Sequence, residues 1–485
     1  MNLALRPGTF RNSTAILITS FIFGQNCLAL SDVTPGESVQ PAQDDQETNP
    51  VRLAQATPDE FSTKYARVTK KILQSAIAME RLSLQYRLKS CKIPLFTKLV
   101  FFGTQEAGAA SALAFEIEAV RQFGRGKRSL LSFNKEAMSR GLRTAEVGSI
   151  VAASGSGTAL SANMLKYAIA RSQGFDTRSM NREIKKQLNQ IDALLDEREK
   201  LVDANPSHPT HRRAEIEGRI FRALRTAFVN EYSQFSTNTA SSATTQNLFF
   251  ALNASYNILG AIAAEVGEQS ISTPKLNGPS NILFTISGAM AAASPLICAT
   301  QLYVQRKIML KTQLRKFSSK NDSRENLTEL CAQLDQPIAN EGSLIPSLPA
   351  SRRLAMYTDS SHLFVKQLEN EVDTMRKLNK VALQNSIAGP AIGGLLMTQG
   401  ILGTRGYYHY FPRHPKKQFA LNYDGAICGT TAASMAVLGN AAWMVASFVY
   451  ENRLRKQNRL PEQLIRQRLK HLEDLETTVN AINVE

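Results

Sequence analysis

The chain alternates between long uncharged segments and stretches that are dense in charge. Six apolar segments follow residue 60, and each approaches the roughly 20 residues that a helix needs to cross a bilayer. They cover residues 95–119, 147–170, 248–264, 281–304, 381–403 and 426–450. This pattern predicts six membrane-spanning helices. The alternative is the buried helical core of a soluble protein, although one soluble domain seldom needs six such segments.

Small residues dominate the uncharged segments. Gly, Ala, Ser and Thr are especially frequent in residues 154–162, 287–294 and 425–434. In a membrane, small side chains let helix backbones approach closely. We therefore expect these helices to pack against one another more than against lipid.

The charged stretches between these segments have apolar residues at helical spacing. Three such sets are Ile184, Leu188, Ile191, Leu195 and Val202; Val365, Leu368, Val372 and Met375; and Ile465, Leu469, Leu472 and Val479. Heptad-like spacing of this length favours paired helices rather than an extended coiled-coil fibre.

The six segments form three pairs, whose connecting loops centre near Phe133, Thr273 and His414. The centres are about 140 residues apart, and even spacing is typical of internal repeats. The predicted fold is thus all-α and polytopic, with three tandem units of helix, transmembrane hairpin and returning helix. Each unit should end in an antiparallel helical stalk. The units cover residues 61–204, 211–335 and 350–485, separated by Pro-containing stretches at 205–209 and 336–349.

The N-terminal residues resemble a secretory signal. Arg6 and Arg11 precede a short apolar core, and small residues allow cleavage after Ala29. We predict a signal peptide over residues 1–29; an uncleaved first membrane helix is the alternative. Residues 30–60 are rich in Pro, Asp, Glu, Gln and Thr, which predicts a disordered linker.

A cleaved signal would place the stalks on the exported side of the plasma membrane, or of an internal membrane reached by the secretory route. The short loops would then face the cytoplasm. The basic first and third loops agree with this orientation, because Lys and Arg favour the cytoplasmic side. A basic stretch at residues 306–316 argues for the opposite orientation.

The formal net charge is +16. A basic surface can meet nucleic acid or anionic lipid. Here much of the Lys and Arg flanks the uncharged segments, so we expect membrane lipids as partners, with anionic headgroups possible, and consider nucleic acid unlikely. The cysteines fit no zinc or redox motif, but Cys91 and Cys331 could pair in an oxidising compartment.

Two charged residues lie well inside predicted spans, Glu106 and Lys166. Charges in a membrane are costly and are often functional. Because both belong to the first hairpin, they form a candidate intramembrane pair. Alternatively, the limits of the segments are misdrawn, or Lys166 extends its ammonium group to the membrane surface.

The third loop combines aromatic and basic residues. Its candidate residues are Arg405, Tyr407, Tyr408, His409, Tyr410, Arg413, Lys416 and Lys417. This combination suits the lipid headgroup region. A loop that docks on a partner protein is an alternative, whereas a metal or nucleotide site at His409 and His414 lacks a third ligand type nearby.

The sequence contains no complete catalytic motif, so we expect that the chain is not an enzyme and binds no cofactor or metal. There is no His-Glu-x-x-His sequence, and Arg128 follows Gly126 and Lys127 where a phosphate-binding loop needs Ser or Thr. The favoured hypothesis is a membrane-embedded scaffold of the cell envelope whose stalks engage a partner or a second copy. A pore or transporter built from three pseudo-repeats is the main alternative. A soluble protein that inserts its hairpins on demand, or an enzyme, is a third.

Overall fold

The computed structural model describes residues 60–90, 95–323, 325–335, 367–456 and 461–481. Every regular element in these ranges is a helix, so the all-α prediction is confirmed for the described part of the chain. The predicted signal peptide, nearly all of the linker and Cys91 lie outside the described residues. So do the Pro-rich stretch 336–349 and the side chains of the predicted seam at residues 365–375.

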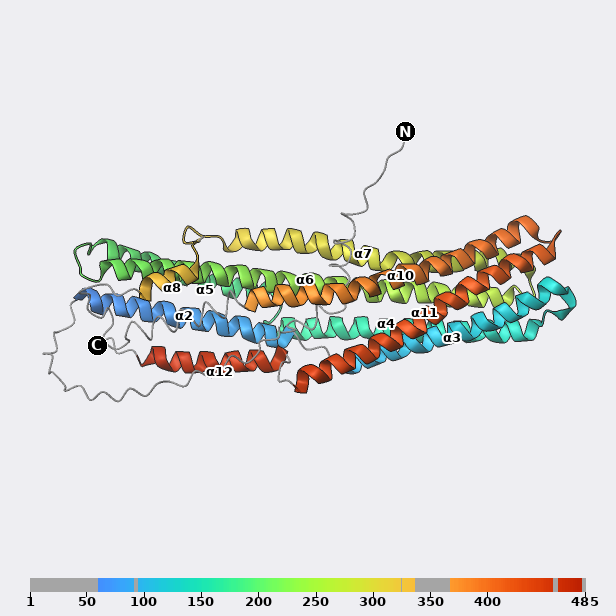
Figure 1. Cartoon of the computed structure of the whole chain (residues 1–485), viewed down its shortest axis with the longest axis horizontal. Helices are drawn as coiled ribbons and strands as arrows, with labels where there is room; N and C mark the ends of the chain where they lie inside the picture. Colours follow the sequence, from blue (N-terminus) through green and yellow to red (C-terminus); the bar gives the residue numbers. More distant parts are fainter. Residues whose placement is uncertain (1–59, 91–94, 324, 336–366, 457–460, 482–485) are drawn as a thin grey trace, which may run out of the picture.

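Long helices run along the length of an elongated bundle (Figure 1). In chain order the elements are α2 (Glu60–Ser90), α3 (Leu95–Arg128), η1 (Leu130–Ser132), α4 (Lys135–Ser172), α5 (Thr177–Asp203), α6 (His211–Gln269), η2 (Pro274–Leu276), α7 (Asn277–Phe317), α8 (Leu327–Asp335), α10 (Gln367–Tyr410), α11 (Pro415–Lys456) and α12 (Pro461–Asn480).

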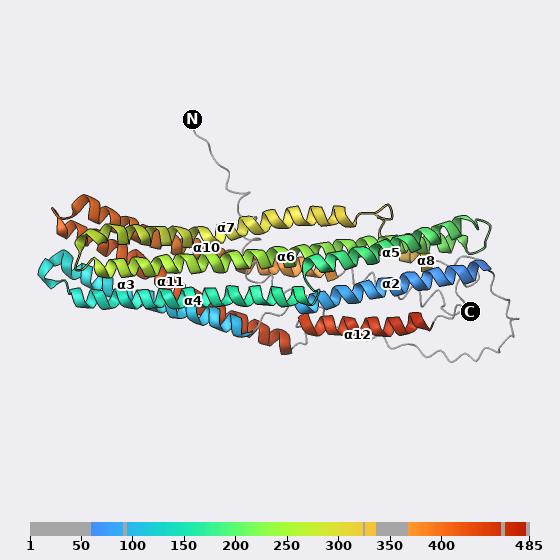
Figure 2. The same ribbon diagram turned by 180° about the vertical axis from the view of Figure 1, so that it is seen from behind.

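Three helical hairpins fill one end of the bundle. α3 turns into α4 through η1, α6 turns into α7 through η2, and α10 turns into α11 at residues 411–414. These turns coincide with the predicted loop centres at Phe133, Thr273 and His414. All three turns lie at the same end of the molecule (Figures 1 and 2).

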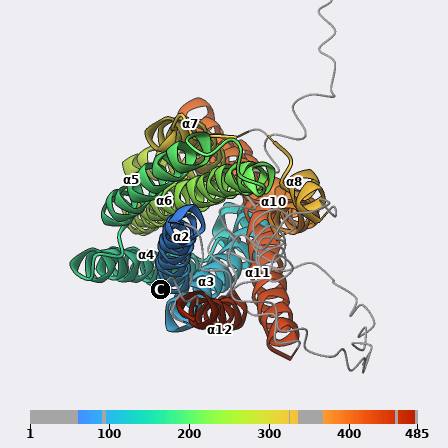
Figure 3. The same cartoon turned by 90° about the vertical axis from the view of Figure 1, so that its left-hand side faces the viewer.

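The six hairpin helices pack in a closed order. α3 contacts α4, α4 contacts α6, α6 contacts α7, α7 contacts α10, α10 contacts α11, and α11 returns to α3. Viewed along the bundle, α3 and α7 accordingly lie on opposite sides (Figure 3). The three hairpins therefore surround a common axis.

The molecule divides into two halves along its length. We call residues 95–172, 246–310 and 389–456 the hairpin half, and residues 60–90, 177–245, 311–335 and 461–481 the stalk half. The main apolar core of the stalk half joins α2, α5, the first part of α6, the end of α7 and α8. It includes the predicted seam residues Ile184, Leu188, Ile191, Leu195 and Val202, all of which are buried.

A short connection, residues 173–176, separates α4 from α5. Gly174 has φ = +74°, a backbone conformation that glycine adopts without a Cβ clash. The Asp176 side chain then caps α5 by accepting hydrogen bonds from the backbone N–H groups of Arg178 and Ser179, at 3.0 and 3.3 Å. By contrast, α6 runs through both halves as one helix of 59 residues.

The last helix does not simply complete the third unit. α12 packs on α2, through a small apolar cluster of Leu84, Ile465 and Leu472. The outer helix of the third predicted unit is thus joined to the first unit. The seam residues Ile465, Leu472 and Val479 are buried, as their spacing predicts.

By length and composition, two helical stretches in the described residues could cross a membrane. They are His211–Gln269 and Pro274–Phe317. The same test is passed by core helices of soluble proteins, and it supports two of the six predicted spans. The six-span topology and the three-unit repeat stay predictions.

Candidate functional site

Glycines bring α7 and α10 into very close contact. A Cβ on Gly393 would overlap the backbone of Ala292, and one on Gly288 would overlap the backbone of Met397. Gly400 faces Thr285 in the same way, and Gly403 faces the Asn281 side chain. The small residues therefore serve direct helix–helix packing, which is the use that the sequence predicted for them.

The outer surface of the hairpin half is apolar. All exposed large apolar side chains in the described residues belong to this half. Examples from four of its helices are Val147, Ile150, Ile258, Ile286, Ile297, Leu438 and Val445. The stalk half exposes none among the residues described there. Many exposed apolar side chains confined to one part of a molecule are typical of a surface that meets lipid or a large partner.

A band without Asp, Glu, Lys or Arg crosses most of the hairpin half. It covers residues 147–165 of α4, 232–264 of α6, 276–305 of α7, 381–404 of α10 and 425–450 of α11, and the runs of α6 and α10 continue beyond the hairpin half. The shortest of these runs is 19 residues, or about 28 Å of helix, close to the thickness of a bilayer's hydrocarbon core. Helix α3 is the exception, because Glu106 and Glu116 bracket only nine uncharged residues.

Basic and aromatic residues lie at the border of this band that faces the stalk half. Tyr167 and Tyr303 are both exposed there. The Lys307 ammonium group lies 6.0 Å from the centre of the Tyr303 ring. Tyr with Lys or Arg is the combination enriched where membrane helices pass through the headgroup region.

The structure does not bring Glu106 and Lys166 together. The neighbouring Gln105 donates a 2.9 Å hydrogen bond to the carbonyl oxygen of Ala152, so Glu106 lies at the level of Ala152. Lys166 is 14 residues further along α4, which is about 21 Å along the helix. That separation is far beyond the reach of an ion pair. Spacing along the sequence could not reveal this, because it does not fix the register of the hairpin.

The third loop packs against the second hairpin. Tyr407 stacks on Phe411, with ring centres 5.4 Å apart, and its hydroxyl lies 3.5 Å from the carbonyl oxygen of Lys275. Gly278 leaves room for the rings of Tyr407 and Tyr408. The basic candidate residues of the loop are exposed to solvent: Arg405, His409, Arg413, Lys416 and Lys417. Lys417 also lies 5.6 Å from the centre of the Tyr410 ring.

One buried carboxyl group inside the hairpin half was not singled out from the sequence. Glu116 is 3% exposed, and its Oε1 accepts a 2.6 Å hydrogen bond from Gln399 Nε2. Its Oε2 has no hydrogen-bond partner within the described residues. Gly429 lies against both side chains, so the contact links α3, α10 and α11. Its four-residue spacing from Gly108 and Ala112 is the signal that could have marked Glu116 as facing inward.

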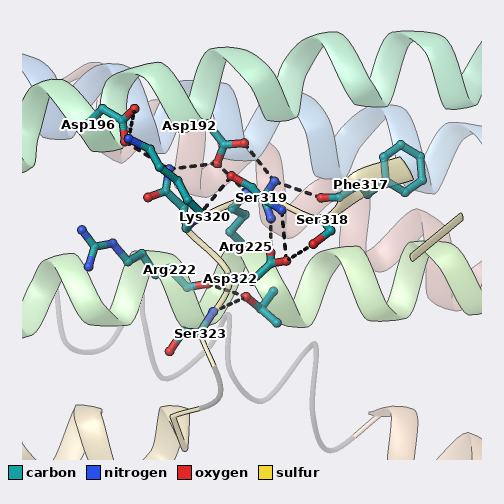
Figure 4. A network of polar contacts seen from close by, with 12 residues as sticks. Asp192, Asp196, Arg222, Arg225, Phe317, Ser318, Ser319, Lys320, Asp322 and Ser323 are labelled. Atoms are coloured by element: carbon teal, nitrogen blue, oxygen red, sulfur yellow. Dashed lines mark hydrogen bonds and ion pairs between the residues drawn. The ribbon is translucent and has the colours of Figure 1, made fainter. Parts of the chain in front are cut away.

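Arg225 forms a second polar centre, in the stalk half (Figure 4). Its side chain is 3% exposed and binds both carboxylate oxygens of Asp192, at 2.6 and 2.9 Å. It also pairs with Asp322 and donates to the Phe317 carbonyl oxygen at 3.1 Å. Bidentate Arg–carboxylate pairs are geometrically specific, so this centre fixes α5, α6 and the α7–α8 connection in one register.

The α7–α8 connection makes further contacts in the same network. Lys320 pairs with Asp196 at 3.0 Å, and the Ser323 backbone N–H donates to Thr226 Oγ1 at 2.9 Å. The hydrogen bond from Lys320 lowers the pKa of Asp196. On the next turn, the hydrogen bond from Arg219 likewise lowers the pKa of Glu325.

Other buried ion pairs hold the stalk helices together. Arg198 lies 3.6 Å from Glu217, which also accepts a 2.6 Å hydrogen bond from the Tyr65 hydroxyl. Arg87 pairs with Glu231 at 2.8 Å, joining α2 to α6. The predicted seam skips one position between Leu195 and Val202, and Arg198 occupies it. This position on the apolar face is the sequence signal that could have marked Arg198 as buried.

The interface between α12 and α2 also contains a buried pair. Arg468 and Glu80 lie 3.2 Å apart, and both side chains are nearly inaccessible to solvent. Burial raises the pKa of Glu80, while the charge of Arg468 opposes that shift.

No group of three or more His, Cys, Asp or Glu side chains in the described residues is placed to hold a metal ion. Of the cysteines, Cys331 is buried in the stalk core, and the candidate partner Cys91 lies outside the described residues. No protein-family model and no curated protein matches this chain. The functional argument therefore depends on the two surfaces and the polar contacts described above.

Proposed function

We propose that this chain is a membrane-embedded scaffold, in which the hairpin half spans a bilayer and the stalk half engages a partner or a second copy. The observation that carries the proposal is the confinement of exposed large apolar side chains to the hairpin half. In water such a surface would favour association or aggregation. In a bilayer it is matched to the lipid chains.

The interior of the hairpin half supports the same proposal. Lipid provides little hydrophobic driving force between helices, so close packing of small residues must hold them together. The glycine contacts between α7 and α10 supply such packing. The uncharged band and the tyrosines at its border match the thickness and the chemistry of a bilayer.

The stalk half suits a role in water. Its core contains large apolar side chains, its surface is charged, and its buried ion pairs are all matched across helices. Buried pairs of this kind can fix a unique register. We propose that the stalks lie on the exported side, following the predicted signal peptide, and present a rigid helical surface to a protein.

A labelling experiment tests the proposed membrane topology. Single cysteines at Tyr408 and at Gln187, in a chain whose five native cysteines are replaced by Ser, would be probed in intact cells with an impermeant reagent. Labelling at Gln187 alone is the expected result. Labelling at Tyr408 alone would show that the orientation is the reverse of the proposed one. If both sites are labelled and alkaline carbonate also extracts the protein, membrane insertion would be contradicted.

The closed order of the hairpin helices favours a second candidate, a pore or transporter. Pseudo-symmetric repeats around an axis are a common design for transport proteins. The rings of Phe115 and Phe284, which stack with centres 6.5 Å apart between the opposite helices α3 and α7, count against a wide path. Ion conductance in reconstituted bilayers would support this candidate over the scaffold, and its absence for all tested ions would leave the scaffold favoured.

A further inference from the structure

The turns of the first and third hairpins present apolar side chains to solvent at the far end of the molecule. Leu131 is 98% exposed, and Leu130 beside it is 43% exposed. In the third hairpin, Tyr408 and Phe411 are 59% and 37% exposed. We call these four residues, together with the Lys and Arg residues of 121–140, 270–276 and 405–417, the crown.

Basic residues are frequent in and beside the three turns. Residues 121–140, 270–276 and 405–417 contain eleven Lys and Arg but one Glu. The basic residues nearest to the leucines are Arg125, Lys127, Arg128 and Lys135, and all four are exposed. The crown is thus strongly positive and is matched in charge to an acidic surface.

Aromatic contacts and a hydrogen bond hold the turn that carries Leu130 and Leu131 in place. Phe133 contacts both Phe123 and Phe419, with ring centres 6.2 and 5.1 Å apart. Ser132 Oγ donates to the Arg125 carbonyl oxygen at 2.8 Å. The two leucines are therefore displayed on an ordered turn and are not part of the core beneath it.

The crown stands beyond the membrane in which the proposed function places the hairpin half. Helix α4 runs for 12 residues, from Lys135 to Glu146, between the first turn and the start of its uncharged run, which is about 18 Å of helix. The headgroup layer on one side of a bilayer is only about 5–8 Å thick. Leu131, in the first turn, therefore lies beyond the headgroup layer of that membrane.

We infer that the crown docks on a second, apposed membrane that contains anionic lipid, so that the protein bridges two bilayers. Lys and Arg would contact the lipid phosphates, while Leu130, Leu131, Tyr408 and Phe411 enter the interface. An acidic partner without an apolar phase, such as nucleic acid, would leave the exposed leucines without a role. This inference depends on the proposed function.

Vesicle tethering tests the inference. The full chain would be reconstituted in vesicles of neutral lipid and mixed with fluorescent vesicles of either neutral lipid or a neutral and anionic mixture. Capture of the anionic vesicles alone is expected. Replacing both Leu130→Ser and Leu131→Ser should reduce capture by about tenfold or more, since each leucine would lose its apolar burial.

Two further variants separate docking by the crown from general attraction to a basic protein. Removing three charges, by Lys127→Gln, Arg128→Gln and Lys135→Gln, should also reduce capture by about tenfold or more. The matched control also removes three charges, by Lys185→Gln, Lys186→Gln and Lys200→Gln, at exposed positions of α5 in the stalk half. With this control, capture should stay within about twofold of the parent. Circular dichroism should be the same for all variants, because every substituted side chain is exposed.

Extraction of the same vesicles with alkaline carbonate distinguishes the two proposals. Retained protein that captures no anionic vesicles, or whose capture is unchanged by the crown variants, would overturn the inference alone. Equal capture of neutral vesicles, or an equal loss with the control, would do the same. Protein that is extracted by carbonate would overturn the proposed function and the inference with it.

Discussion

The stalk half and the hairpin half bury different kinds of side chain. The largest fully buried residues, such as Tyr65, Tyr86 and Tyr232, all belong to the stalk half. At the helix contacts of the hairpin half, glycine, alanine and serine take their place. The stalk half buries its apolar residues and its arginine pairs, whereas the hairpin half buries some large apolar residues, such as Phe115 and Leu142, and exposes many others. The two halves thus use the same helical geometry with different distributions of apolar side chains.

The largest effect is expected from the buried arginine that holds the stalk half together. Arg225→Ala would leave Asp192 and Asp322 without their partner and should destabilise the stalk half by about 3–5 kcal/mol. Urea unfolding followed by circular dichroism would measure the change. The exposed Arg182 on α5 is the control, and Arg182→Ala should alter the unfolding free energy by at most about 0.5 kcal/mol. Equal effects would mean that the network does not hold the helices together.

A charge in the middle of the apolar exterior should have the next largest effect. Leu438 is 70% exposed and lies at the centre of the uncharged run of α11. Leu438→Arg should disfavour membrane insertion by about 2.5–3.5 kcal/mol, which would appear as protein lost from carbonate-washed membranes. Asn189→Arg on the exposed face of α5 is the matched change in the stalk half. If neither variant alters the membrane-bound fraction, the two exteriors do not differ as proposed.

A single methyl group should disturb the interior of the hairpin half. Gly393→Ala would place a Cβ against the backbone of Ala292, and overpacking of this kind costs about 1–3 kcal/mol. The neighbouring Gly394 has open space at the same position, so Gly394→Ala should be neutral or slightly stabilising. Thermal unfolding in detergent micelles would compare them. A larger loss for Gly394→Ala would contradict the observed packing.

Acid should loosen one part of the stalk half. Lys320 lowers the pKa of Asp196, and Arg219 lowers the pKa of Glu325. The two carboxylates therefore make their full contribution to the stability of the stalk half above the pKa values of the unfolded state, about 4. That contribution is lost as the pH falls through the lower folded-state values. A spin label at the exposed Thr328→Cys should become more mobile over that range. In an Asp196→Asn and Glu325→Gln variant, the mobility should no longer change there.

The sequence predicted the elements better than their partners. Uncharged runs and heptad spacing are local, so the helices and the turns near Phe133, Thr273 and His414 could be located from them. Register and partner choice depend on contacts between distant segments. For this reason the separation of Glu106 from Lys166, and the packing of α12 on α2, could not be read from spacing.

The polar centres were missed for a related reason. Arg225 and Arg198 look like ordinary surface charges in the sequence, because a charged residue is rarely buried unless a distant residue pairs with it. Glu116 lies near the end of the first predicted span, where a charge is expected at the membrane surface. In α5 the seam skips a position between Leu195 and Val202, and Arg198 fills that position. A charge that falls in an otherwise apolar seam therefore deserves to be treated as a buried candidate.

Helix α6 gives the molecule a fixed length. Its 59 residues run without a break, over about 90 Å, and it packs on α4, α5, α7 and α8 along the way. A rod of this kind sets a distance as a spacer does, since shortening it would require a kink, and α6 contains no proline, which is a frequent cause of kinks. Whatever the stalk half and the crown contact is therefore held at a constant separation. Inserting or deleting one helical turn in the bundle would change that separation by about 5 Å.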